Sequence, residues 1–208
     1  MRRIPLSYLE EALRDPVAYR QRLDQEINAE GLPRQTYFGA LRDAIYRFHK
    51  SGDNLIEARR YLQRRLASFA SIDRKLETVD QLEWYAENVS HRGWITFQNR
   101  LHVEVPLPQR VSSELYCSGE VSRIDMVPTG GYAVWLIRVR GANNVFTELC
   151  MPLIQDTVAR ITLNVLPSEI QVGVYSFTEQ FVNTRSYTRQ EIFNAHTELG
   201  NLLRRMGY

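Results

Sequence analysis

The chain has 208 residues, of which 44% are hydrophobic and 24% are charged, and its formal net charge is +2. This composition excludes a disordered protein and is typical of one globular domain with a sizeable hydrophobic core. No apolar run approaches the roughly 18 residues that a membrane helix needs, and the first residues lack the apolar region of a secretory signal. We therefore expect a cytoplasmic protein with no membrane partner.

The cysteines and the basic residues narrow the function classes further. Cys117 and Cys150 cannot supply the four thiolates of an iron–sulfur cluster or of a tetrathiolate zinc site, so both are expected to be buried thiols. Apart from Lys50 and Lys75, every basic residue is an arginine. Arginine favours bidentate phosphate contacts, although a coding bias toward arginine explains the same composition.

Helical patterns fill the first 93 residues. Pro16 should divide the segment that begins at Ser7 into two short helices, since proline breaks a helix interior. Apolar residues spaced three and four apart then predict a helix that ends at Ser51 and Gly52. Further helices are expected over residues 54–72 and about 79–90.

The helix over residues 54–72 carries four arginines away from its apolar face: Arg59, Arg60, Arg64 and Arg65. Such a group could meet the phosphates of a nucleic acid. A solvated helix face, partly paired with Glu57, explains the same pattern, and both interpretations stay open.

Strand patterns follow Gly93. Alternating and β-branched residues predict strands over 94–107, 114–127 and 132–141, with a turn at 128–131, and together they predict an antiparallel meander. A helix over 148–166, a strand over 170–177 and a last helix over 188–206 complete the chain.

This order of elements resembles the PD-(D/E)XK nuclease superfamily, in particular its RecB-type and Cas4-like branch. The motifs that carry the resemblance are the opening helix Ser7–Tyr19, "GALRD" from Gly39, Glu104, "GEVSRID" from Gly119, the "PTGG" turn, "LIRVRG" from Leu136 and "CMPLI" from Cys150. The resemblance implies an α/β (α+β) fold with a restriction-endonuclease-like mixed central sheet flanked by helices. It further implies one domain, 1–208, with a helical region over 1–93, a sheet core with a crossover helix over 94–182 and a C-terminal helix over 186–207.

The catalytic residues of that family are largely missing. The family holds Mg²⁺ or Mn²⁺ with carboxylates and uses a lysine beside the scissile phosphate. Its histidine corresponds here to Asp43, its metal aspartate to Ser122, the acid and lysine of its D-x-K motif to Ile137 and Val139, and its Q-x-x-x-Y pair to Cys150 and Ile154. Glu104 alone keeps its type. The four histidines, His49, His91, His102 and His196, have no metal-ligand spacing and are expected at the surface or in packing.

Strand geometry shows that neighbouring residues do not replace the missing acid and lysine. Successive side chains on a strand point to opposite faces, so Ile137 and Val139 share a face with Ala133 and Trp135, whereas Arg138 and Arg140 share the other. Arginine can serve neither as a metal ligand nor as a base near neutral pH.

Three acids are candidates for a relocated metal site: Glu104, Glu120 and Asp125. Glu120 shares the face of Ser122, whereas Asp125 has the opposite parity unless a bulge intervenes. Solvated strand ends are the alternative explanation for Glu120 and Asp125.

The sequence therefore predicts a catalytically inactive nuclease-like subunit without metal or cofactor, which binds nucleic acid, DNA rather than RNA, and/or scaffolds a DNA-processing or defence complex with protein partners. Two alternatives remain: an active DNA nuclease that uses Mg²⁺ or Mn²⁺ with relocated acids, and a protein-binding structural adaptor. The predicted nucleic-acid contacts are Arg59, Arg60, Arg64, Arg65, Arg123, Arg138 and Arg140.

Overall fold

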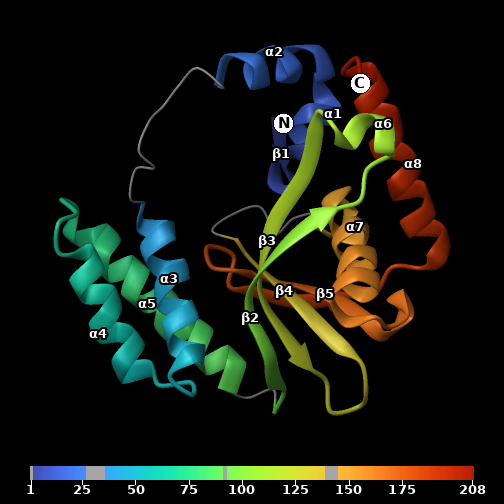
Figure 1. Cartoon of the computed structure of the whole chain (residues 1–208). Helices are drawn as coiled ribbons and strands as arrows, with labels where there is room; N and C mark the ends of the chain where they lie inside the picture. The colour runs from blue at the N-terminus through green and yellow to red at the C-terminus, as the bar shows by residue number, and fades with distance from the viewer. Residues whose placement is uncertain (1, 27–35, 91–92, 139–144) are drawn as a thin grey trace.

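A six-stranded mixed sheet forms the centre of the computed structural model, which describes residues 2–26, 36–90, 93–138 and 145–208 (Figure 1). Its strands are β1 (Arg2–Pro5), β2 (Ile95–Val105), β3 (Leu115–Met126), β4 (Tyr132–Arg138), β5 (Ile170–Ser176) and β6 (Phe181–Arg185). They run in the order β1-β3-β4-β5-β6, and β2 pairs with β3. The predicted fold class, a mixed sheet flanked by helices, is confirmed.

Strand β3 organises the sheet because it pairs with three others. β2 pairs with it antiparallel along nearly its whole length. β1 pairs with its first part in parallel, over residues 115–118, and β4 pairs with its last part antiparallel, over residues 123–126. Between these two stretches, residues 119–121 pair with β2, and residues 119–122 pair with neither β1 nor β4. The sheet therefore forks where β3 and β4 separate.

One helical layer covers one face of the sheet and consists of α3 (Tyr37–Lys50), α4 (Leu55–Leu66) and α5 (Ile72–Ser90) (Figure 1). Thr36 caps α3 by accepting a hydrogen bond from the backbone of Gly39, and Asn54 caps α4 in the same way. The buried faces of these helices pack on Trp135 and Tyr175 of the sheet.

The opposite face of the sheet packs against a second layer. It contains α1 (Leu9–Arg14), α2 (Pro16–Glu26), α7 (Cys150–Thr157), a π-helical turn that continues α7 over Val158–Leu163, and α8 (Arg189–Arg205). Helix α7 crosses over from β4 to its parallel neighbour β5. Short segments complete the described chain: η1 (Leu6–Tyr8), α6 (Gln109–Ser112), η2 (Val145–Thr147) and η4 (Pro167–Glu169).

Most of the predicted elements are present. The antiparallel meander β2-β3-β4 and the break between two helices at Pro16 are confirmed. β4 alternates as expected, with Ala133 and Trp135 toward the α3–α5 layer and Val134 toward α7. The sequence did not predict β1 or β6, and the region expected to be helical therefore opens with a strand. None of the helices described here is both long and apolar enough to cross a bilayer.

Candidate functional site

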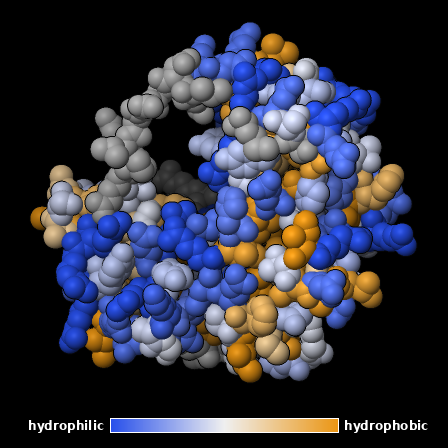
Figure 2. Space-filling view, in the orientation of Figure 1, coloured by the Kyte–Doolittle hydropathy of each residue, from blue (hydrophilic) through white to orange (hydrophobic). Residues whose placement is uncertain are grey.

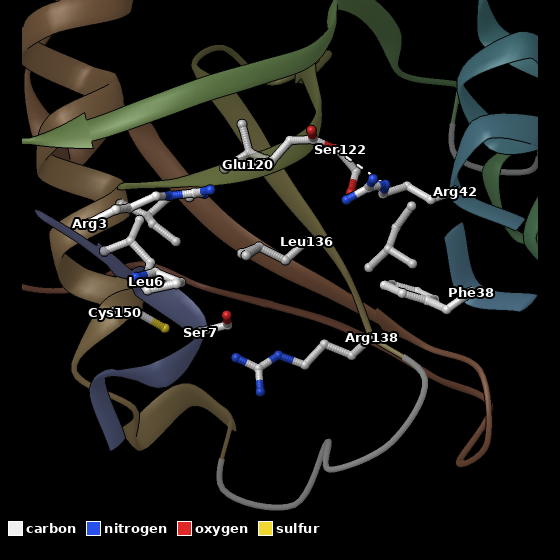
Figure 3. Close-up of a pocket in the computed structure, with 15 residues that line it drawn as sticks. Arg3, Leu6, Ser7, Phe38, Arg42, Glu120, Ser122, Leu136, Arg138 and Cys150 are labelled. Atoms are coloured by element: carbon white, nitrogen blue, oxygen red, sulfur yellow. Dashed lines mark ion pairs between the residues drawn. The ribbon is translucent and has the colours of Figure 1, made fainter. Parts of the chain in front are cut away.

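A pocket of about 490 Å³ lies at the fork of the sheet (Figure 3). Residues 119–122 of β3 and residues 136–138 of β4 line it where the two strands separate. The N-terminal segment contributes Arg3, Leu6 and Ser7, and α3 contributes Phe38 and Arg42. No described strand pairs with this side of residues 119–122, and the side chain of Leu6 packs beside Gly119.

The pocket brings together residues that lie far apart in the sequence. Ser122, Ile137, Cys150 and Ile154 all line it, and these are four of the positions that correspond to nuclease motifs. Val139, which corresponds to the lysine of the D-x-K motif, lies outside the described residues. Four of the motif positions that the sequence resemblance assigns therefore line one pocket, with side chains other than those of a nuclease, whereas Asp43 and Glu104 lie outside its lining.

Glu120 is the one carboxylate among the described residues that line the pocket, and two arginines already neutralise it. Nε of Arg100 lies 3.0 Å from Oε2 of Glu120, and Nε of Arg42 lies 3.6 Å from Oε1 (Figure 3). Arg100 also contacts Asp43 at 3.4 Å, and Asp43 pairs with Arg65 of α4 at 3.0 Å. The hydrogen bond to Glu120 raises the pKa of Arg100 above its ordinary value. A chain of alternating charges thus joins α4, α3, β2 and β3.

The donor set of this pocket does not fit Mg²⁺ or Mn²⁺. Such ions take several oxygen ligands, with carboxylates prominent among them. Among the described lining residues, the side-chain oxygen donors are the paired carboxylate of Glu120 and the hydroxyls of Ser7 and Ser122. Burial raises the pKa of the Cys150 thiol, which keeps it protonated. Within the described part of the chain, no three His, Cys, Asp or Glu side chains are placed to hold a metal ion.

The three candidate relocated acids have different surroundings. Glu104 is exposed and sits opposite Ser118, whereas Glu120 sits opposite His102, so one residue pair, Val103 and Gly119, lies between these two pairs on β2 and β3. Asp125 is 1% exposed and lies within the sheet. The expectation that Asp125 is a solvated strand end is therefore wrong.

Asp125 is buried because the side chains of β3 switch from one face of the sheet to the other after Val121. Val121 and Ile124 belong to the same hydrophobic cluster, although residues three apart on a regular strand point to opposite faces. On the neighbouring strand, Arg100 has a φ of 52°, and β2 pairs with β3 on either side of it. After Val121 the side chains of β3 have switched faces, so Arg123 and Asp125 contact Tyr85 and Trp135 on the α3–α5 side of the sheet.

Arg123 is only 2% exposed and cannot reach a phosphate in this structure, which corrects its assignment as a nucleic-acid contact. Its Nε donates to Oδ2 of Asp125 at 2.8 Å, and Nε1 of Trp135 donates to the same oxygen at 2.8 Å. Its Nη1 donates to Oη of Tyr85 at 2.9 Å and lies 2.8 Å from Nε2 of His49. Burial alone would lower the pKa of Arg123, but Tyr85 and Asp125 raise it above its ordinary value.

His49 completes this buried polar cluster. Its Nδ1 lies 2.7 Å from Oδ1 of Asp53, and its Nε2 lies 2.8 Å from Oη of Tyr85. Burial lowers the pKa of His49 despite the hydrogen bond to Asp53, so the imidazole is neutral near pH 7. The neutral ring donates from Nδ1 to Asp53 and accepts from Arg123 at Nε2. The cluster therefore ties α3 and α5 to the centre of the sheet.

The other predicted nucleic-acid contacts are only partly gathered at the pocket. Arg138 lines it and is paired with Glu148, to which Nη1 donates at 2.8 Å. The four arginines of α4 lie on the helical layer, where Arg59 pairs with Glu83 and Arg65 with Asp43. The surface over α4 is largely hydrophilic (Figure 2). Arg140 and His91 lie outside the described residues.

Sequence reasoning missed Arg3 and Arg42 as pocket residues. Arg42 precedes Asp43, the position that corresponds to the family histidine, so its place near the site could have been expected. Nothing in the sequence placed Arg3 near the site, because the strand that carries it was not predicted.

Comparisons with known proteins leave the family open. No known protein family matches this sequence, and no curated protein matches it. Nine chains of solved structures resemble the fold. One is a protein of Eubacterium rectale, provisionally described as an exonuclease, with a TM-score of 0.49 and 8% identity over 88% of this chain and 72% of that one. A likeness this distant indicates no activity.

Proposed function

We propose that this chain is a nuclease-like protein of the RecB-type and Cas4-like kind that binds nucleic acid at the fork pocket and does not cleave it with a metal ion. Two features support this kinship. The hairpin β3-β4 is followed by the crossover helix α7 and the parallel strand β5, which is the order that the sequence resemblance implies. The corresponding motif positions Ser122, Ile137, Cys150 and Ile154 line one pocket.

The observation that carries the proposal is the pairing of Glu120 with Arg42 and Arg100. In a metal-dependent nuclease, a divalent cation balances several carboxylates and activates water beside the phosphate. Here the guanidinium groups supply the positive charge, and Ser122 and Ile137 occupy the positions of two acids. Positive charge without metal ligands favours holding a phosphate over hydrolysing it.

Arg3 is the pocket arginine best placed to contact a phosphate. Its Nε donates to Oγ of Ser118 at 2.9 Å, which fixes the side chain on β1. No acidic partner for Arg3 is found among the residues described. By contrast, Arg138 is held by Glu148 and Arg42 lies beside Glu120. A phosphate in the pocket would therefore meet the least neutralised charge at Arg3.

The wider role extends this proposal. We propose DNA rather than RNA as the ligand, and a place within a larger DNA-processing or defence assembly with protein partners, on the strength of the sequence resemblance. A ligand-binding subunit without its own hydrolytic chemistry suits such an assembly, because a partner then supplies the enzymatic step.

Fluorescence polarisation with labelled DNA at low salt tests the binding proposal. Reversing the charge at the pocket with Arg3→Glu should weaken binding by roughly tenfold and reduce the salt dependence by about one phosphate contact. Arg189→Glu is the matched control, since Arg189 is an exposed arginine at the start of α8, outside the pocket lining. Unchanged affinity in Arg3→Glu, or equal losses in both variants, would remove the pocket as the binding site.

A further inference from the structure

The fork pocket has an apolar floor beneath its charged rim. The half-buried side chains of Leu136, Ile137 and Phe38 form it, and Leu136 lies near the middle of the view in Figure 3. A phosphate group alone would leave this floor in contact with water. The floor therefore indicates a ligand with an apolar body as well as an anionic group.

Helix α3 presents an aromatic ring and a cation to the pocket together. Phe38 and Arg42 are four residues apart, so they project from the same face of the helix one turn apart. The cap formed by Thr36 and Gly39 fixes the first turn, which carries Phe38. Figure 3 shows Phe38 and Arg42 on one side of the pocket, with Arg3 and Leu6 on the other.

The size of the pocket limits what can enter it. A volume of about 490 Å³ lies within the range of small-molecule sites, which is roughly 300–1,000 Å³. A stacked and paired duplex is far too wide for such a pocket, whereas a single unstacked nucleotide has a suitable size. An aromatic side chain beside the site can then stack on the base, as in proteins that bind single strands.

We infer that the fork pocket accepts one unpaired nucleotide, with its base against Phe38 and Leu136 and its phosphate toward the arginines on the rim. This inference rests on the proposed function and names its ligand: a single-stranded nucleic acid, or a nucleotide that has left its stack. Duplex DNA without an unpaired nucleotide should reach only the charged surface and should bind less tightly.

The test compares two single-stranded polymers of equal length, a thymidine oligonucleotide and the same sugar–phosphate chain without bases. Both carry the same phosphates, so their affinities at one salt concentration differ only through the bases. The wild-type protein should bind the thymidine oligonucleotide roughly tenfold more tightly, the range expected for one stacked base. Phe38→Ala should remove most of this preference and leave the affinity for the base-free chain unchanged.

Two further variants keep the result interpretable. Phe193→Ala removes an exposed phenylalanine of α8 that is 64% exposed, and it should keep the preference. Phe38→Leu preserves apolar packing in case Phe38→Ala unfolds, and it should still lower the preference. Equal wild-type affinity for both polymers would overturn the nucleotide pocket while leaving nucleic-acid binding intact. Binding of neither polymer at low salt would instead overturn the proposed function itself.

Discussion

Arg100 of β2 and Glu120 of β3 form an ion pair at the rim of the fork pocket, with Nε 3.0 Å from Oε2. The same guanidinium reaches Asp43 of α3 at 3.4 Å, so one arginine balances two carboxylates. Arg42 adds a second positive charge beside Glu120. Glu120, which could have been a metal ligand, is thus paired with two arginines of the same chain. This arrangement has measurable consequences.

The first prediction concerns divalent metals. Mg²⁺ or Mn²⁺ should leave the unfolding temperature unchanged, because the described lining of the pocket supplies one carboxylate, which arginines already neutralise. A metal at 100 times its dissociation constant would add about 2.7 kcal/mol to the free energy of unfolding, which is several degrees for a chain of this size. Thermal unfolding in MgCl₂ or MnCl₂ is compared with NaCl of matched ionic strength. A rise specific to the divalent salts would show that a metal site exists.

The second prediction concerns the buried pair Arg123 and Asp125. Arg123→Met should lower the free energy of unfolding by about 3–5 kcal/mol, since it leaves a buried carboxylate without its counter-ion. Adding Asp125→Leu to this variant should recover part of the loss. Arg65→Met, in a pair that is partly exposed, should cost about 1 kcal/mol or less. Urea denaturation measures all three, and similar losses in Arg123→Met and Arg65→Met would show that the buried pair has no special role.

The third prediction is a pH dependence that comes from His49. Burial lowers the pKa of His49 in the folded protein, whereas the unfolded chain has an ordinary histidine pKa of about 6.5. The unfolded state therefore binds the proton more readily, so this contribution to stability is complete above about pH 6.5 and falls as the pH decreases below it. His49→Gln should flatten that decline, while His102→Gln, at an exposed site, should not. The same decline in wild type and His49→Gln would assign it to other groups.

The fourth prediction tests the packing behind the pocket. A Cβ atom on Gly173 would lie 2.3 Å from Cζ3 of Trp135, which is fully buried and hydrogen-bonded to Asp125. Gly173→Ala should therefore lower the free energy of unfolding by about 1–3 kcal/mol or more. Gly200→Ala is the matched control, because its Cβ would meet nothing within 4 Å and should stabilise α8 by up to about 1 kcal/mol. Equal stabilities for the two variants would contradict the packing described for Trp135.

Much of the fold could be predicted because it follows from local periodicity. The helices α3 and α4 have apolar residues three and four apart, and β4 alternates cleanly between Trp135 on one face and Val134 on the other. The strands β1 and β6 escaped prediction because each has only four or five residues, too few to establish a period of two. β1 also depends on its pairing with β3, more than 110 residues away.

The candidate site, like the fold, could be predicted only in part. Matching motifs by sequence order placed Ser122, Ile137 and Cys150 around one pocket, since the order of elements fixes which strand ends meet. Counting alternate residues failed for Arg123 and Asp125, because β3 changes its facing between Val121 and Ile124. The register between β2 and β3 is the same on either side of this change, and a simple alternation of residues gives no sign of it.

The central claim is that the fork pocket holds nucleic acid without metal-dependent cleavage. The most direct test incubates the protein with end-labelled single-stranded DNA in Mg²⁺ or Mn²⁺ at low salt, and follows retention and strand length on gels from the same sample. We expect retained DNA of full length. Shortened DNA that Glu120→Gln protects from cleavage would contradict the account, since Glu120 would then serve a metal ion.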